Sequence, residues 1–369
     1  MATVGSICES LDSWSPNRLA ANWDNVGLLY GTIDFPVKTV LLCLTITSGV
    51  VSEAAEMGAE MIISHHPVLL AGAKRITNET TQGKNLLELG RLGVAIYSPH
   101  TAHDSAQDGV NHQIAERLGM KNIVPIHPIE CEKHWKLIVF SPASDVESLY
   151  QSLFDLGAGK IGIYSECSYK SRGIGSFQGE AKANPVVGQP GIREKVEEWR
   201  LEIVCPQRLL GAAKAAIRSP HRHEEPAFDL IPLNMGKSLE GEGRIGYLAK
   251  PLQLIKLAEL CQGIFAAPLV QVIGDPRQLV RKLGIGCGAA GGWFKDASNL
   301  GADAFITGEM KYHEELEAFQ EKIGVVLLGH HASEGFALDS MRKRLEQAFP
   351  GLGISKAKRD DVTRRCLVA

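Results

Sequence analysis

The sequence lacks the marks of several protein classes. Its eight cysteines lie more than twenty residues apart, so there is no Cys-x-x-Cys pair for a zinc ribbon or a redox site. We expect most of them to be reduced core residues. No uncharged apolar run approaches the roughly 18 residues of a membrane-spanning helix. The amino-terminal stretch carries Glu9 and Asp12 and has no cationic region followed by an apolar one, which predicts a cytosolic protein.

An excess of positive charge is also missing. The formal net charge of -3 gives no electrostatic reason to expect a nucleic-acid partner. One basic cluster lies near the carboxyl terminus, and we interpret it as a solvated tail: Lys356, Lys358, Arg359, Arg364 and Arg365. With 369 residues, 44% of them hydrophobic and 22% charged, the chain has the composition of an ordered globular protein of two domains.

Strand-like and helix-like patterns alternate at both ends of the chain. In the first 125 residues, strands are expected at residues 39–47, 60–64 and 93–97, and helices at 48–57, 86–92 and 109–118. After about residue 245, strands are expected at 281–286, 304–307 and a final one at 325–328, with helices at 293–300 and 312–320. This α/β order predicts a largely parallel sheet covered on both faces.

The stretch between these halves has a different order. Residues from about 126 to 244 read as strand, helix, strand, strand, helix and strand, which is the order of a split βαβ sandwich. The prediction is therefore a discontinuous three-layer α/β domain made of residues 1–125 and 245–369, with an α+β ferredoxin-like domain inserted at residues 126–244.

Potential metal ligands follow three of the expected strands. The apolar run Met61-Ile62-Ile63-Ser64 ends in His65-His66-Pro67, so two imidazoles stand at one strand end. The other two clusters are His100, His103 and Asp104, and His330, His331 and Glu334. Because ligands gather at the carboxyl ends of strands in open α/β sheets, we expect the three clusters to meet at one edge.

Histidine and carboxylate ligands together suit zinc, manganese or iron(II) better than magnesium or calcium. A single histidine is more often a hydrogen-bonded structural residue. Three clusters at one buried edge, however, cost desolvation energy that a cation would offset. A carboxylate that bridges would make a two-metal centre. Spacing alone does not choose between His330 and His331, which stand four and three residues before Glu334.

Two further stretches follow expected strands. The glycine-rich run 284–292 contains backbone amides that suit an anion, but it lacks the P-loop ending, and close packing of a strand on a helix explains it equally well. The run 308–313 carries Glu309, Lys311 and His313. These side chains suit substrate contact or proton transfer, while a solvated helix start explains Glu309 and Lys311 equally well.

Taken together, these motifs resemble the GTP cyclohydrolase I type 2 homologue family, also called the NGG-interacting-factor-three-like family. The matching motifs, in order, are Trp23-Asp24-Asn25-Val26-Gly27-Leu28-Leu29, Ile63-Ser64-His65-His66-Pro67, His100-Thr101-x-x-Asp104, Gly109-Val110-Asn111, Thr307-Gly308-Glu309-Met310-Lys311-Tyr312-His313 and Gly329-His330-x-x-Ser333-Glu334. They cover both halves of the chain.

The resemblance implies two divalent ions and a set of ligands for them: His65, His66, Asp104, His330 and Glu334. It implies that Glu334 is shared, that His66 and Asp104 hold one ion, and that His65 and His330 hold the other. His100 and His313 would lie behind the ligands or face the substrate. The insert would be a PII-like or CutA-like domain, and the assembly a toroidal hexamer whose metal sites face an internal cavity.

The chain departs from the usual family pattern at three positions. An aromatic residue is common at the position of His331, and an apolar residue at that of His103, so both histidines are candidates for enlarging the site. Cys287 follows Gly286, which places a soft thiol beside the metals or makes it a space-filling residue.

Two functions follow from these expectations. The first is a metal-dependent hydrolase in which water activated by two ions attacks a cyclic amidine, amide or phosphate substrate, with a nucleotide as one candidate. His100 or His313 would then transfer the proton. The alternative is a metal-loaded regulatory or partner-binding ring without turnover, gated by the insert. A ring that threads nucleic acid is disfavoured by the acidic balance of the chain.

Overall fold

The structure is a computed structural model that describes residues 2–130, 132–184, 186–218, 226–234, 236 and 238–360. The chain forms two compact units, one made of Met1–Ile129 with Ser238–Ala369 and the other of Glu130–Lys237. Each unit has its own buried core. Within the described ranges, no helix combines the length and the apolar character that crossing a bilayer demands.

The first unit contains two main sheets rather than the single sheet expected. The five-stranded sheet has the order β1-β4-β3-β2-β17, and its strands are β1 (Gly27–Tyr30), β4 (Ala95–Ser98), β3 (Met61–Ser64), β2 (Thr39–Cys43) and β17 (Gly353–Lys356). Its pairs are parallel except for the β1 edge, which runs antiparallel to β4. The expectation of a largely parallel sheet holds for this part.

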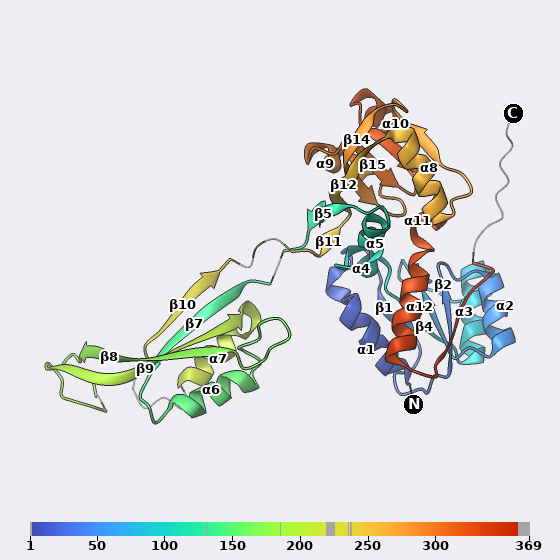
Figure 1. Ribbon diagram of the computed structural model, residues 1–369. Helices are drawn as coiled ribbons and strands as arrows, with labels where there is room; N and C mark the ends of the chain where they lie inside the picture. Colours follow the sequence, from blue (N-terminus) through green and yellow to red (C-terminus); the bar gives the residue numbers. More distant parts are fainter. Residues whose placement is uncertain are drawn as a thin grey trace, which may run out of the picture. The chain divides into compact units, whose positions relative to one another are not determined.

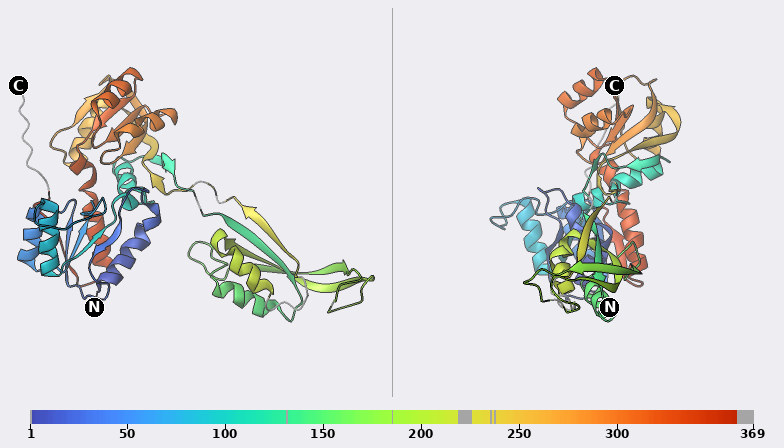
Figure 2. Two further views of the ribbon diagram at one scale, coloured as in Figure 1. Left: turned by 180° about the vertical axis from the view of Figure 1, so that it is seen from behind. Right: turned by 90° about the vertical axis from the view of Figure 1, so that its left-hand side faces the viewer.

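Both faces of this sheet are buried. Val40 and Leu42 of β2 point to one core, and Leu41 and Cys43 point to the other, as the alternation of a strand requires. The covering helices are α1 (Val4–Trp14) and α12 (Ala337–Ala348) on one face, and α2 (Ser48–Met57) and α3 (Thr81–Leu92) on the other (Figures 1 and 2). The result is a helix–sheet–helix sandwich.

The second sheet has six strands in the order β13-β16-β15-β14-β12-β5. Its strands are β13 (Gln271–Ile273), β16 (Gly324–Leu327), β15 (Ala304–Thr307), β14 (Leu279–Gly286), β12 (Arg244–Gln253) and β5 (Lys121–Val124). Only the central strands β14, β15 and β16 are parallel, and the flanking pairs are antiparallel. A small ribbon pairs β6 (His127–Pro128) with β11 (Gly241–Glu242).

Helices cover this sheet on both faces as well. Ile285 and Ile306 belong to one core, and Phe305 and Val325 belong to the other. The helices are α5 (Val110–Arg117) and α8 (Leu254–Phe265) in the first core, and α9 (Phe294–Asn299) and α10 (Tyr312–Gln320) in the second. Short helical segments complete the unit: η1 (Asn17–Leu19), α4 (His100–Ser105), η3 (Gly291–Trp293) and α11 (His330–Glu334).

The two halves of the sequence exchange elements. Helix α5 and strand β5 pack with the second sheet, while α12 and β17 return to the first. Residues 325–328 were expected to be the final buried strand, and β17, which is only partly buried, follows it without having been predicted. The exchange places α11 between the two sheets, as Figure 1 shows. The carboxyl ends of β3 and β4 consequently face the end of β16 across α11.

The described part of the basic cluster is solvated as expected, but it follows a strand and is not a free tail. Lys356 ends β17, and its Nζ lies 2.8 Å from Asp339 Oδ1. The Arg359 guanidinium donates to both Glu56 carboxylate oxygens, at 2.9 and 3.0 Å. Pairing of β17 with β2 brings these cations against acidic side chains. Arg364 and Arg365 lie outside the described residues, as do Cys131 and Cys366.

The second unit has the expected element order. It runs β7 (His134–Ser141), α6 (Val146–Asp155), β8 (Ser168–Gln178), β9 (Arg193–Pro206), η2 (Gln207–Leu209), α7 (Leu210–Arg218) and β10 (Phe228–Leu233). The four strands form an antiparallel sheet in the order β10-β7-β9-β8. Both helices pack on it through Leu149, Leu153, Ala213 and Ile217. This is the topology of a split βαβ sandwich.

Arg244, at the start of β12, is fully buried in the first unit. Its guanidinium donates to the carbonyl oxygens of Gly241 and Gly243 at 2.6 Å, and to that of Ala106 at 2.5 Å. Burial lowers its pKa to about 10. Because Ala106 follows α4, this cation ties the second sheet to the helix that carries His100 and Asp104.

We expect Arg244→Met to lower the free energy of unfolding by about 3 kcal/mol, because several buried carbonyl groups lose their donor. Urea denaturation followed by circular dichroism measures the change. The matched control is Arg91→Met in α3, where the side chain is 75% exposed. There the expected change stays within about 0.5 kcal/mol. Equal stability of the two variants would contradict the proposed anchoring role.

Candidate metal centre

Residues from the three predicted clusters meet in the first unit. His65 and His66 directly follow β3, and their amides donate to Cys43 and Leu44 of the neighbouring chain segment at 3.0 and 2.8 Å. Helix α4 follows β4 after Pro99 and carries the second cluster. Helix α11 follows β16 after Gly329 and carries the third. Strand ends of two sheets, rather than one shared edge, thus supply the side chains.

Glu334 lies at the centre of this arrangement and is only 5% exposed. Its Oε2 is 3.0 Å from His66 Nε2, 3.3 Å from His330 Nε2 and 3.9 Å from His65 Nε2. On the far side, His65 Nε2 is 3.5 Å from Asp104 Oδ1. One carboxylate therefore faces three imidazoles.

Three groups of three described residues have ligand atoms close enough for one ion each, and two of these groups contain Glu334. His65, Asp104 and Glu334 form one, and His66, His330 and Glu334 form the other, with all ligand atoms of a group within 4.8 Å. Glu334 is shared, but the histidines are paired the opposite way from our expectation. The side chain of His65 is buried beside α4, whereas that of His66 turns towards α11. Sequence order does not reveal such directions.

In His66 and His330, the ring nitrogen that points away from Glu334 forms a hydrogen bond. His66 Nδ1 is 2.7 Å from Thr45 Oγ1, and His330 Nδ1 is 2.8 Å from Glu309 Oε1. Each contact leaves Nε2 turned towards Glu334. Orientation of a ligating histidine through its second nitrogen is a general feature of metal sites. Glu309 thus holds the His330 ring, a contact that the sequence left open, and nothing in the sequence pointed to Thr45.

Burial and like charge perturb these groups strongly. Burial lowers the pKa of His65 well below its ordinary value. Burial and the charge of Glu334 together raise the pKa of Asp104. Burial opposes the ionisation of Glu334, but hydrogen bonds from His330 and His66 outweigh it and hold its pKa low. Those contacts to Glu334, reinforced by Glu309, raise the pKa of His330 to about 9.

Two buried atoms at this point have no hydrogen-bond partner among the described residues: His65 Nε2 and Asp104 Oδ1. They face each other at 3.5 Å. Unpaired polar atoms in the interior are costly, and a cation between them would satisfy both. The nitrogen and carboxylate donors fit zinc, manganese or iron(II), so the residues present suit divalent metal ions.

His100 lies on the rim of the site. Its Nδ1 is 2.8 Å from both carboxylate oxygens of Asp24, and its ligand atoms come within 4.8 Å of those of His65 and His66. Burial opposes protonation of His100, but Asp24 outweighs this and raises its pKa. The backbone of His100 has φ +27°, an uncommon conformation for a residue other than glycine. Asp24 belongs to a quoted motif, yet sequence reasoning gave it no role.

The other candidate histidines do not join the groups found among the described residues. His103 is fully buried, with its ring 4.4 Å from that of Trp14. His331 Nε2 lies 4.0 Å from Asp360 Oδ1. His313 is exposed at the start of α10, with its ring 5.6 Å from that of Tyr312. The first two leave the ligand set unchanged in this structure.

The glycine-rich run after β14 shapes the site by close packing. A Cβ on Gly284 would meet Ala297 of α9 at 2.6 Å, which supports strand–helix packing as the reason for this glycine. Asn111 Oδ1 accepts from the Cys287 amide at 2.8 Å. The Cys287 thiol lies near Asp104, and burial raises the pKa of the thiol well above its ordinary value. Gly288 lies directly against Glu334.

The chain is similar to known proteins over most of its length. The chain is 34% identical to the GTP cyclohydrolase 1 type 2 homolog of Halalkalibacterium halodurans, over 94% of this chain and 93% of the relative. It is 32% identical to the protein of the same name from Bacillus subtilis, over 89% of this chain and 88% of the relative.

Solved structures of similar proteins share the fold of this chain. A Bacillus cereus protein related to NIF3 aligns with a TM-score of 0.78 and 31% identity, covering 100% of this chain and 99% of that one. Staphylococcus aureus protein SA1388 shares the fold, with a TM-score of 0.82 at 24% identity and 99% coverage of both chains. The family described as Duf34/NIF3 (NGG1p interacting factor 3) matches residues 2–360. The chain therefore belongs to the Duf34/NIF3 family.

Proposed function

We propose that this protein is a hydrolase that uses two divalent metal ions. The observation that carries the proposal is that Glu334 belongs to both groups of potential ligands, so one carboxylate can serve two ions. His65 and Asp104 would complete the site of one ion, and His66 and His330 that of the other. When bound, such ions lower the pKa of a water molecule and polarise a carbonyl, amidine or phosphoryl group.

His100 is the residue that we propose for proton transfer. Asp24 holds its Nδ1, which leaves Nε2 on the side of His65 and His66. A carboxylate behind an imidazole keeps the ring oriented and favours the protonated form. The ring of Trp23, which is 65% exposed, lies 5.9 Å from His100 and offers a flat surface to a substrate. His313 was the other expected candidate, and its exposure makes it the comparator in the test.

The substrate class follows from this surface and from the relatives. A cyclic amidine, amide or phosphate ester fits water activation, and the relatives' name, GTP cyclohydrolase 1 type 2 homolog, makes a nucleotide the first candidate. We further propose that the second unit is a PII-like domain, because it has the split βαβ topology. A cytoplasmic homohexamer remains part of the proposal on the strength of the family resemblance alone.

Steady-state kinetics with GTP and a panel of nucleotides and cyclic amides tests the function, after element analysis of the purified protein. We expect His100→Gln to lower kcat by about 100-fold or more while the bound metal stays unchanged. His313→Gln should leave kcat within about threefold of the wild type. A His100→Gln variant with full activity would remove His100 from the mechanism. Bound metal without turnover on the whole panel would favour the alternative of a metal-loaded regulatory ring.

A further inference from the structure

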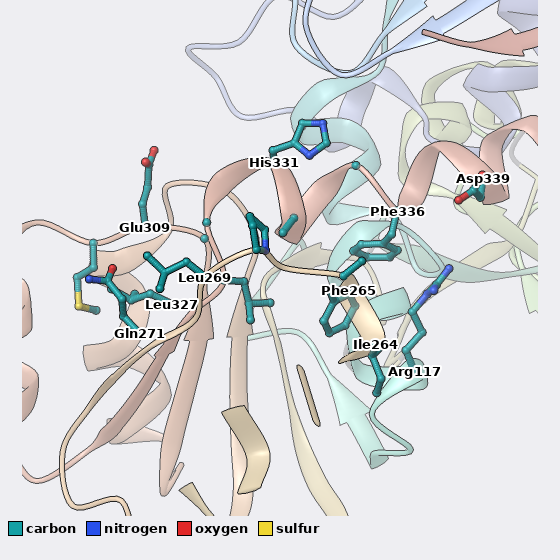
Figure 3. Close-up of a pocket in the computed structure, with 18 of the residues that line it drawn as sticks. Arg117, Ile264, Phe265, Leu269, Gln271, Glu309, Leu327, His331, Phe336 and Asp339 are labelled. Atoms are coloured by element: carbon teal, nitrogen blue, oxygen red, sulfur yellow. The ribbon is translucent and has the colours of Figure 1, made fainter. Parts of the chain in front are cut away.

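A cavity of about 780 Å³ lies on another face of α11. His330 and Glu334, four residues apart, share the face of this helix that meets the metal centre. His331, Ala332 and Gly335 line the cavity instead. Figure 3 shows His331 on the helix above the opening, with Phe336 and Arg117 to one side and Glu309 on the other. The volume is typical of a small-molecule site.

One end of the cavity is aromatic. The rings of Phe265 and Phe336 lie 5.1 Å apart at an angle of 53°. Ile264 lies beside Phe265 in Figure 3, and Leu269 lines the cavity nearer to Leu327. Leu269 is 50% exposed. A flat apolar ring fits against such a pair of aromatic rings.

Arg117 lies at the same aromatic end of the cavity, and none of the described acidic side chains forms an ion pair with it. The Arg117 guanidinium lies 4.7 Å from the centroid of the Phe336 ring. No carboxylate of the described residues lies within ion-pair distance of Arg117. The other cation of the lining, Lys356, is paired with Asp339 at 2.8 Å. Arg117 is therefore the group available to an incoming anion, and guanidinium binds carboxylates, sulfonates and phosphates through two parallel donors.

We propose that this cavity binds a planar aromatic or heteroaromatic anion, with the ring against Phe265 and Phe336 and the anionic group on Arg117. The site is separate from the metal centre and does not depend on the proposed hydrolysis. The two sites nevertheless share a helix and a side chain. Glu309 lines the cavity and also contacts His330 Nδ1, so an occupant of the cavity would touch a residue that orients a proposed metal ligand.

The test uses the full chain as purified and two probes that share one ring system, the anion naphthalene-1-sulfonate and the neutral naphthalene-1-methanol. Isothermal titration calorimetry measures the affinity for each. We expect one sulfonate per chain, bound about fivefold more tightly than the alcohol because of its charge. Arg117→Gln should abolish this difference by weakening only the sulfonate. Ala332→Phe, which fills the cavity, should weaken both probes.

The matched control is Arg342→Gln on α12, where the arginine contacts Glu346 and does not line the cavity. It should bind both probes like the wild type. Absence of saturable binding, or an Arg117→Gln variant that keeps the preference for sulfonate, overturns the proposal. Element analysis of the same samples separates the two hypotheses. If the protein binds the probe but contains no metal, the cavity proposal holds and the hydrolase proposal fails. If it contains metal but does not bind the probe, the hydrolase proposal holds and the cavity proposal fails.

Discussion

Glu334→Gln is expected to abolish binding of both proposed metal ions. The carboxylate faces His65, His66 and His330 within 3.9 Å and belongs to both ligand groups, so one substitution weakens two sites at once. An amide of the same shape loses the negative charge that attracts the cations. We expect metal affinity to fall by more than the roughly 10- to 100-fold typical of an orienting residue behind a ligand. Competition with a chelator, followed by element analysis, measures the loss.

Glu309→Gln is the matched control. Glu309 contacts the metal centre only through His330 Nδ1, at 2.8 Å, so the change should weaken a single site. About tenfold is the expected loss. Circular dichroism of both variants shows whether the fold is retained. A Glu334→Gln protein that holds two ions as tightly as the Glu309→Gln protein would refute the shared role of Glu334.

Gly288→Ala is expected to disturb the metal centre without changing any ligand. Gly288 has φ +59°, and a Cβ there would stand 2.2 Å from Glu334 Oε1 and 3.3 Å from His330 Nε2. Either the glutamate must move, which displaces a ligand that the two ions would share, or the loop beside it must move. We expect metal binding to fall sharply and the free energy of unfolding to drop by about 1–3 kcal/mol. Metal titration and urea denaturation measure the two effects.

Gly58→Ala is the control for Gly288→Ala, because it introduces the same backbone strain without a steric clash. Gly58 ends α2 with φ +64°, and a Cβ there meets nothing within 4 Å. The substitution should cost about 1 kcal/mol of stability from the left-handed backbone alone, with metal binding intact. If the two alanine variants bind metal equally well, the close packing of Gly288 against Glu334 does not contribute to metal binding.

Local sequence signals predicted many elements well. The helix expected at 48–57 has the observed bounds of α2, because Thr47 caps its start and Gly58 ends it in the left-handed conformation. The strand at 304–307 matches β15, a run buried on both faces. Strand β17 was missed, since Gly353–Lys356 is a short edge strand with alternating exposure. Its place in the sheet depends on pairing with β2, more than 300 residues away.

The sequence by itself determined the periodic elements and the chemistry available at their ends, because helix and strand patterns and metal-binding residue types are local properties of the chain. Only the tertiary structure decided that two sheets meet at α11, that His65 pairs with Asp104 and His66 with His330, and that Asp24, Thr45 and Glu309 hold the rings. The physical reason is distance along the chain. Contacts between residues hundreds of positions apart arise from how buried faces pack, and spacing does not encode the direction in which each side chain then points.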